Sequence, residues 1–182
     1  MRIKYAFISF ILCLLSIFLE IECRDKAILI TIEKAKSPHD IAWGLMGRQS
    51  LPQNHGMLFF YSAPRKTSLW MFNCRIDLSA AIIDKDRVIQ EIHELSAYPE
   101  MMDPLRPVTT IEDINRYYPP RDPIRRFFDQ RRIISLKPAM FVLEMNAYWF
   151  QENGIQVGDV IDYDENSSQC WIISKKVMSD ER

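Results

Sequence analysis

Aromatic, amide and carboxylate side chains stand close together near two apolar runs of this sequence. Trp70, Asn73 and Asp77 lie within one short stretch, and Glu144 and Asn146 end a later run. An indole ring stacks on the face of a sugar, while amides and carboxylates form hydrogen bonds with hydroxyl groups. Together with Arg48, these residues therefore predict a binding site for a sugar or a peptidoglycan fragment.

Two of these residues, Asp77 and Glu144, suggest a catalytic alternative. A pair of carboxylates acts as general acid and base in glycoside hydrolysis when the two groups lie about 5 to 9.5 Å apart. The structural alternative is that Glu144 accepts hydrogen bonds from Arg48 or from backbone N–H groups, and that Asn73 ends its strand in a turn. Both alternatives remain open at this stage because the spacing along the chain gives no distance.

A second group of side chains offers soft ligands. It consists of Met46, His55, Met57, Met71, Met140 and Met145. Thioether and imidazole groups bind Cu(I) outside the cytoplasm, but methionine in an apolar strand is also ordinary core filling. No M-x-x-M or H-x-x-x-H spacing is present. We therefore expect no metal and no cofactor, and keep a Cu(I)-binding protein as a further alternative.

The composition excludes several classes of protein. The chain has 182 residues, of which 48% are hydrophobic, and its formal net charge is −1. This hydrophobic content is sufficient for a folded core, and the length favours one domain. The balanced charge gives no general attraction to polyphosphate, so we expect no nucleic-acid partner.

The first 23 residues have the pattern of an export signal. Arg2 and Lys4 precede an apolar run over residues 5–19, which is short for a complete membrane span. Residues 19–22 lack a small-x-small cleavage site, so an uncleaved anchor is an alternative, and Cys23 adds lipidation as a third. Each alternative predicts a domain outside the cytoplasm that is periplasmic, secreted or anchored to a membrane.

The rest of the chain shows the pattern of a mainly β domain over residues 26–177. Short apolar runs predict strands at 27–33, 56–61, 68–73, 78–83, 87–95, 139–145, 160–163 and 171–177. Short helices are expected at 38–46 and 148–153. These elements predict a single compact β-sandwich or small barrel with two or three short helices, rather than a parallel βαβ fold.

A proline-rich, basic insertion at roughly 103–137 interrupts this domain. Thr110 and Asp122 are expected to begin two short helices within it. Arg125, Phe127 and Phe128 on the second helix are candidates for docking an anionic surface or a protein partner. The alternative is that the phenylalanines pack on the domain and the arginines remain in water.

Two cysteines, Cys74 and Cys170, lie in the predicted domain. In an oxidising compartment they could form a disulfide, and the alternative is two buried free thiols.

Five motifs follow one another along the chain. They are Gly44-Leu45-Met46-x-Arg48-x-x-Leu51, Gly56-Met57-Leu58-Phe59, Trp70-Met71-x-Asn73, Leu143-Glu144-x-Asn146-Ala147 and Gly154-Ile155-x-x-Gly158-Asp159. Their order and spacing over residues 26–102 and 138–177 resemble the signature of the domain of unknown function 192 family. The resemblance implies a small extracytoplasmic β domain, often behind a signal or anchor, with no established reaction.

The sequence also departs from the pattern of that family. Cys74 stands where the family usually has threonine, and Tyr148 stands where it usually has glycine. The proline-rich insertion is longer than the usual connection. Together, these features predict an exported or membrane-tethered module of the cell envelope that binds a glycan or protein partner without catalysis. The alternative is a carboxylate-dependent hydrolase that acts on envelope glycans.

Overall fold

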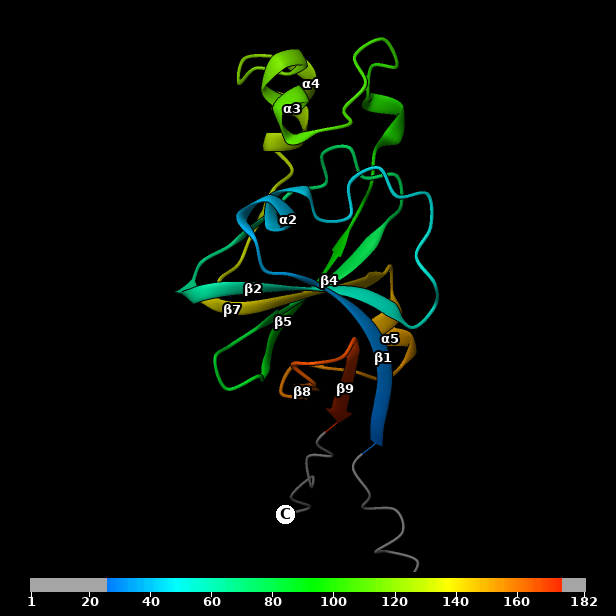
Figure 1. Cartoon of the computed structure of the whole chain (residues 1–182), viewed down its shortest axis with the longest axis vertical. Helices are drawn as coiled ribbons and strands as arrows, with labels where there is room; N and C mark the ends of the chain where they lie inside the picture. The colour runs from blue at the N-terminus through cyan, green and yellow to red at the C-terminus, as the bar shows by residue number, and fades with distance from the viewer. Residues whose placement is uncertain (1–25, 175–182) are drawn as a thin grey trace, which may run out of the picture.

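A curled β-sheet forms the body of the computed structural model, which describes residues 26–174. In the order of the sheet, its seven strands are β5 (Ile89–Leu95), β4 (Leu78–Ile83), β7 (Ala139–Asn146), β2 (His55–Arg65), β1 (Lys26–Ala35), β9 (Gln169–Ser174) and β8 (Val160–Tyr163). A second, two-stranded sheet pairs β3 (Ser68–Leu69) with β6 (Ile133–Ile134). Figure 1 shows the large sheet below the helical insertion.

The two edges of the large sheet meet at one end. The backbone N–H of Ile89 donates to the carbonyl of Asp159 at 2.8 Å, and the N–H of Ile161 donates to the carbonyl of Arg87 at 3.0 Å. These hydrogen bonds join the start of β5 to β8 and curl the sheet toward a barrel, which partly removes its free edges. The predicted fold class, mainly β with a few short helices, is therefore confirmed.

One strand pair has an orientation that the sequence patterns did not predict. Strands β1 and β2 are parallel, while the other pairs of the large sheet are antiparallel. The connection between them carries helix α2 (Pro38–Trp43), which Ser37 caps by accepting a hydrogen bond from the N–H of Asp40. A parallel pair requires such a crossover because a tight turn can join only antiparallel strands.

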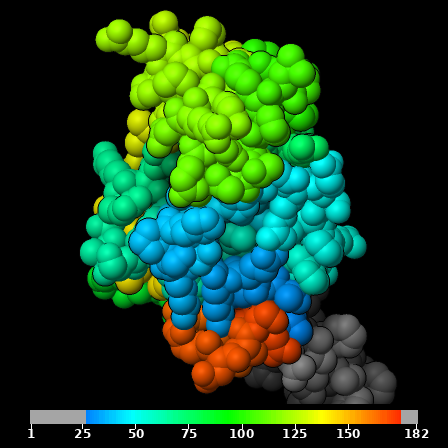
Figure 2. Space-filling model, turned by 45° about the horizontal axis from the view of Figure 1, so that its top comes forward, coloured from blue at the N-terminus to red at the C-terminus, as the bar shows by residue number. Residues whose placement is uncertain are grey.

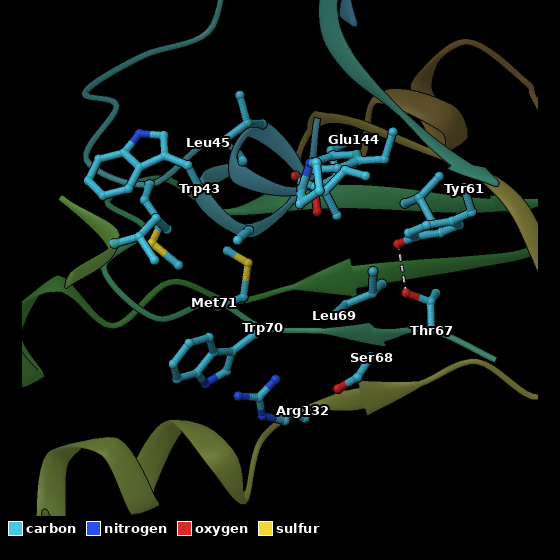
Figure 3. A pocket seen from close by; sticks show the side chains of 18 of the residues that line it. Trp43, Leu45, Tyr61, Thr67, Ser68, Leu69, Trp70, Met71, Arg132 and Glu144 are labelled. Carbon is cyan, nitrogen blue, oxygen red and sulfur yellow. Dashed lines mark hydrogen bonds between the residues drawn. The ribbon is translucent and has the colours of Figure 1, made fainter. Parts of the chain in front are cut away.

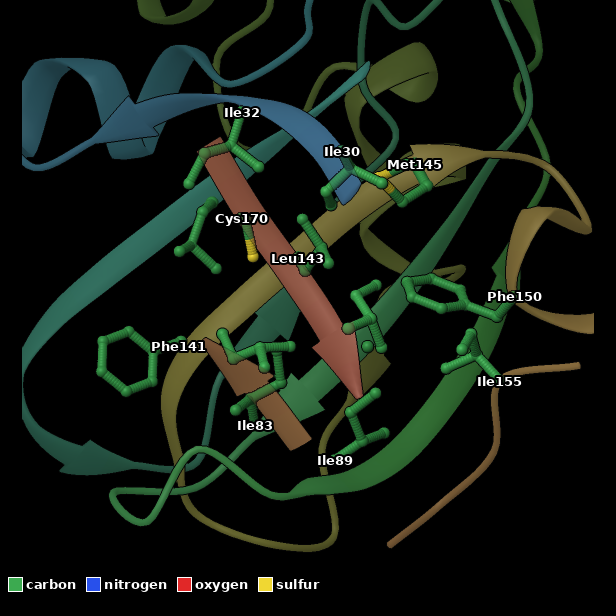
Figure 4. Packing of buried hydrophobic residues seen from close by; sticks show 14 of the residues in the cluster. Ile30, Ile32, Ile83, Ile89, Phe141, Leu143, Met145, Phe150, Ile155 and Cys170 are labelled. Atoms are coloured by element: carbon green, nitrogen blue, oxygen red, sulfur yellow. The ribbon is translucent and has the colours of Figure 1, made fainter. Parts of the chain in front are cut away.

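Strand β4 is buried along its whole length, so the sheet has a hydrophobic core on each face. Ala81 and Ile83 point into the cluster drawn in Figure 4, with Ile30, Leu143 and Phe150. Ala80 and Ile82 point to the other face, where the cluster includes Leu45, Phe59, Leu69 and Val142. The alternation of side chains along β4 distributes its residues between the two cores.

The two cysteines are buried free thiols. Cys170 belongs to the core in Figure 4, whereas Cys74 packs with Phe72 and Tyr118 beneath the insertion. The two thiols lie in separate hydrophobic clusters, so the disulfide alternative is wrong.

The proline-rich insertion folds into α3 (Ile111–Tyr117) and α4 (Pro123–Asp129), and the short 3₁₀ helix η1 (Pro99–Met101) comes just before it. Thr110 and Asp122 cap α3 and α4 as expected. The insertion lies at the end of the molecule opposite the start of β1 and the end of β9 (Figure 1). Near the sheet, the predicted helix after Tyr148 forms the short α5 (Trp149–Glu152).

The prediction of a strand over 68–73 is wrong beyond Leu69. The chain turns at Phe72 and Asn73, where Asn73 adopts a positive φ of 56°. Asparagine tolerates this left-handed conformation better than most residues with a side chain, so it ends the strand early.

The predicted signal or anchor over residues 1–23 and the end of the last predicted strand, 175–177, lie outside the described residues. Within residues 26–174, no helix has the length and apolar character needed to cross a membrane.

Candidate functional site

A cleft of about 730 Å³ lies between the large sheet and the insertion. Its walls come from α2 and the loop after it, from β2, β3 and β7, and from α3, α4 and the residues that follow α4. Figure 2 shows the yellow-green insertion against blue α2, and Figure 3 shows the side chains that line the cleft. The volume is within the range of about 300 to 1,000 Å³ that is typical of small-molecule sites.

Glu144 is the only carboxylate among the described residues that line this cleft. It lies on β7, with Met57 of β2 and Ala80 of β4 as its backbone neighbours in the sheet. Its side chain has no hydrogen-bond or ion-pair partner within residues 26–174. Burial raises the pKa of this carboxyl to about 7. A carboxyl group with a perturbed pKa in a cleft indicates a functional site.

Two neutral groups, Tyr61 and Cys74, lie near enough to Glu144 to sense its charge. That charge raises the pKa of Cys74 and of Tyr61, in both cases as an addition to the larger effect of burial. The Tyr61 hydroxyl and the Thr67 Oγ1 form a hydrogen bond of 2.7 Å on the same side of the cleft (Figure 3). Among residues 26–174, no cation lies near enough to Glu144 to offset the effect of its burial on the pKa.

Trp70 lies on the other side of the cleft, where its indole ring contacts Phe72 and Arg132. Phe72 stacks on the ring with centroids 4.7 Å apart and an angle of 20° between the planes. The Arg132 guanidinium lies 4.0 Å from the ring centroid (Figure 3). Side chains of the protein therefore already contact the ring on which a sugar was predicted to stack, and the indole N–H is buried without an acceptor within residues 26–174.

Two arginines, Arg125 and Arg132, lie beside Trp70, and two further positive side chains line the cleft elsewhere. The Arg125 Nη1 donates to Asn115 Oδ1 at 2.9 Å and to the carbonyl of Tyr118 at 3.0 Å, which holds this arginine against α3. Arg125 also lies 5.7 Å from the Trp70 ring. Arg65 stacks on Tyr61 at 4.5 Å, and it lines the cleft together with Lys36.

Asp77 lies outside the cleft. Its Oδ1 accepts a hydrogen bond of 2.7 Å from the backbone N–H of Ala97, which fixes the chain after β5. Asp77 and Glu144 do not line the same cleft, which is the arrangement that the hydrolase alternative needs. The described lining therefore lacks the second carboxylate that glycoside hydrolysis requires.

Three further predicted ligand-binding residues have structural roles. Arg48 forms a bidentate ion pair with Glu33, at 2.5 and 2.6 Å, and not with Glu144. Asn73 donates to the carbonyl of Val108 at 3.3 Å, and Asn146 donates to the carbonyl of Leu51 at 3.1 Å. These side chains tie loops to the sheet or to one another, and they do not line the cleft.

Of the three docking candidates, the two phenylalanines pack on the domain and the arginine lines the cleft. Phe128 is buried against Phe72 with centroids 5.2 Å apart, and Phe127 is half-buried beneath the guanidinium of Arg131 at 3.6 Å. Arg125 points to the cleft. Packing of the phenylalanines on the domain, which was the structural alternative, is therefore the observed arrangement.

The copper candidates are dispersed. Met145 is buried in one core and Met57 in the core on the other face of the sheet. His55 is exposed at the start of β2. Within residues 26–174, no three His, Cys, Asp or Glu side chains gather as a metal site would require.

Sequence reasoning missed several residues of the cleft, notably Arg132, Arg65 and Tyr61. The excess of arginine in the insertion contains a signal for Arg132, but its position over Trp70 depends on how α4 packs on Phe72. Tyr61 and Arg65 lie on β2, where a pattern of apolar and polar residues does not show which face borders a cleft.

Comparisons with known proteins agree on the fold. A crystal structure described as a putative transcription regulator from Sinorhizobium meliloti is 27% identical, with a TM-score of 0.53 over 75% of this chain and 90% of that one. A protein of unknown function from Novosphingobium aromaticivorans is 22% identical, with a TM-score of 0.54 over 76% and 85% of the two chains. No curated protein matches the sequence.

The family comparison covers most of the chain. Residues 20–163 match the family model DUF192, whose description is "Uncharacterized ACR". This range contains the whole insertion, both sides of the cleft and all five sequence motifs in full. The chain therefore belongs to the DUF192 family.

Proposed function

We propose that this protein is a non-catalytic binding module of the cell envelope, exported or tethered by its N-terminal segment, whose cleft takes a small envelope ligand such as a peptidoglycan fragment. The observation that carries the proposal is the unpartnered Glu144 carboxyl group inside a cleft of about 730 Å³. A desolvated carboxyl without a partner costs stability, and a bound donor would offset that cost.

Binding is favoured over hydrolysis by the chemistry of the lining. Glu144 has no second carboxylate across the described cleft, and the nearby Cys74 thiol is buried, which raises its pKa and keeps it protonated. A protonated, buried thiol is a poor nucleophile. The polar groups that remain, including those of Glu144, Arg125 and Arg132, can orient a ligand but supply no acid–base pair.

A digest of peptidoglycan provides the test. Soluble fragments of about the size of a disaccharide peptide are added to the purified protein, and the thermal unfolding midpoint and the masses of the fragments are followed. We expect a rise in the midpoint for the wild type and no change in fragment mass. The rise should be lost in Glu144→Gln and kept in Glu152→Gln, a matched change at an exposed position on α5.

Two results would contradict the proposal. Fragments that leave the midpoint unchanged at millimolar concentration would exclude binding, and cleaved fragments would show that the protein is a hydrolase. The localisation has its own test, in which fractions of cells that express the full chain are probed for the protein. Recovery in the envelope fractions is expected, and recovery in the cytosol would contradict export.

A further inference from the structure

The cleft has two charged poles on opposite sides. Glu144 lies on the side of the large sheet, and Arg132 lies across the cleft beside Trp70 (Figure 3). The electrostatics agree with this separation, because the pKa of Glu144 is raised by burial alone and no cation lowers it. Within residues 26–174, the acid and the arginines therefore do not neutralise each other.

The cationic pole has more positive charge than its partners balance. Arg125 and Arg132 share one carboxylate, Asp129, whose oxygens lie 3.9 Å from Arg125 Nε and 2.9 Å from Arg132 Nη2. Arg132 uses Nε and Nη2 for this contact, which leaves its Nη1 without a hydrogen bond to any described residue. The Nε of Arg125 is also buried without a hydrogen-bond acceptor in the same part of the chain. Two guanidinium groups with N–H donors still available are suited to binding the carboxylate of a ligand.

Within the part of the chain that the structure describes, no positive group pairs with Glu144 at the acidic pole. The groups that sense Glu144 are the phenol of Tyr61 and the thiol of Cys74, and neither is a cation. A buried carboxylate is stabilised when a donor or a positive group pairs with it. An ammonium group of a ligand would supply both the charge and three N–H donors.

The surface between the poles is mostly apolar. Leu45, Leu69, Met71 and Val142 belong to the core on this face of the sheet and also line the cleft. A ligand that spans the poles therefore contacts hydrocarbon along its middle.

We propose that the cleft binds a small zwitterion of the amino-acid type, a short peptide with free termini, with its carboxylate at Arg125 and Arg132 and its ammonium at Glu144. This inference rests on the proposed binding function and names the chemical class of the ligand. A neutral sugar fits less well because Phe72 and Arg132 already contact the Trp70 ring, and a dianion would place a negative group beside Glu144.

The test uses leucine peptides of one to three residues, each with free termini, with an acetylated N-terminus or with an amidated C-terminus. Binding to the full-length protein is measured by isothermal titration calorimetry. For the best length, the free form should bind at least tenfold more tightly than either blocked form. A blocked peptide that binds as tightly as the free one would overturn the inference.

Two variants test which side of the cleft binds the ammonium group and which binds the carboxylate. Glu144→Gln should remove the preference for a free N-terminus but keep the preference for a free C-terminus, and Arg132→Gln should reduce the second preference while it keeps the first. Glu152→Gln is the matched control and should keep both. Circular dichroism melting curves verify that each variant folds. If the preference for a free N-terminus persists in folded Glu144→Gln, the assignment is wrong.

The results also distinguish this inference from the proposed function. Glycan fragments without amines that bind in a Glu144-dependent manner, with no peptide bound at 10 mM, would overturn the zwitterion but keep the binding module. Absence of binding by both the peptides and the peptidoglycan fragments would overturn both proposals.

Discussion

The guanidinium group of Arg132 lies 4.0 Å from the centre of the Trp70 ring and forms an ion pair with the Asp129 carboxylate. It thereby joins the residues after α4 to the segment after β3 on one side of the cleft. The contact brings two partly buried side chains together, which the sequence alone does not indicate because the residues are far apart in the chain.

Replacement of Arg132 measures how much its contacts with Trp70 and Asp129 contribute to the free energy of unfolding. Arg132→Ala removes a cation–π contact and a partly exposed ion pair, so we expect the free energy of unfolding to fall by about 1 kcal/mol. Arg132→Lys keeps the charge but loses the planar stack and should recover only part of the loss. Urea unfolding of the two variants gives the values. An unchanged stability of Arg132→Ala would show that the stack contributes nothing.

The raised pKa of Glu144 predicts a dependence of stability on pH. In the folded protein the pKa is about 7, above the ordinary 4.5 of an unfolded chain, so the folded state binds the proton more tightly. The resulting stabilisation is complete below about pH 4.5 and is lost as the pH rises through 7. After allowance for solvent in the cleft, its size is on the order of 2 kcal/mol.

Glu144→Gln isolates this effect, because glutamine cannot titrate. Between pH 4.5 and 8, the stability of the wild type should fall by about 2 kcal/mol more than that of the variant, and at pH 8 the variant should be the more stable protein. Urea unfolding at both pH values measures the difference, with Glu152→Gln as control. Parallel pH curves for wild type and Glu144→Gln would contradict the burial of this carboxyl.

Tyr148 is a position where glycine should stabilise the folded protein. Its φ of 60° lies in the left-handed region, and its side chain is 56% exposed, so the ring gains little from packing. Tyr148→Gly relieves the strain and keeps the N–H that donates to Ser79 Oγ at 2.7 Å. We expect a gain of about 0.5 to 1 kcal/mol, net of the greater freedom of glycine in the unfolded chain.

The matched control at this position is Tyr148→Ala, which removes the ring but keeps a Cβ. It should be no more stable than the wild type. Thermal unfolding compares the three proteins. A glycine variant less stable than the alanine variant would show that the backbone is not strained here.

The thiols should resist modification in the folded protein. Burial and the charge of Glu144 raise the pKa of Cys74, and burial raises that of Cys170 to about 12, so neither forms a thiolate near neutral pH. Iodoacetamide at pH 8 should label both only after unfolding in urea, as read by peptide mass mapping. Fast labelling of the native protein, or a peptide that links the two cysteines, would contradict this result.

The elements of the fold were largely predictable, because alternation and capping are local signals. The hairpin around Asp84 and the caps at Thr110 and Asp122 follow from residues within a few positions of one another. The parallel pairing of β1 and β2 was not predictable in this way, since short helices and short strands leave the same pattern in either orientation.

The site was predicted only in part, because tertiary packing decides which side chains reach the cleft. Trp70 and Glu144 do line one cleft, whereas Asn73 and Asn146, of equally suggestive chemistry, bond to loop carbonyls. A polar residue near a strand end is directed to a loop or to a cleft by the packing of distant segments. The arginines of the cleft depend on the insertion, whose position no local pattern specifies.

The central claim is that the cleft between the sheet and the insertion binds a ligand, and the indole N–H of Trp70 tests it most directly. In ¹H–¹⁵N spectra recorded during titration with peptidoglycan fragments, that signal, assigned with Trp70→Phe, should shift saturably together with the backbone signals of Met71 and Glu144. Signals of α5, around Glu152, should stay in place. Shifts that leave Trp70, Met71 and Glu144 unchanged would contradict the account.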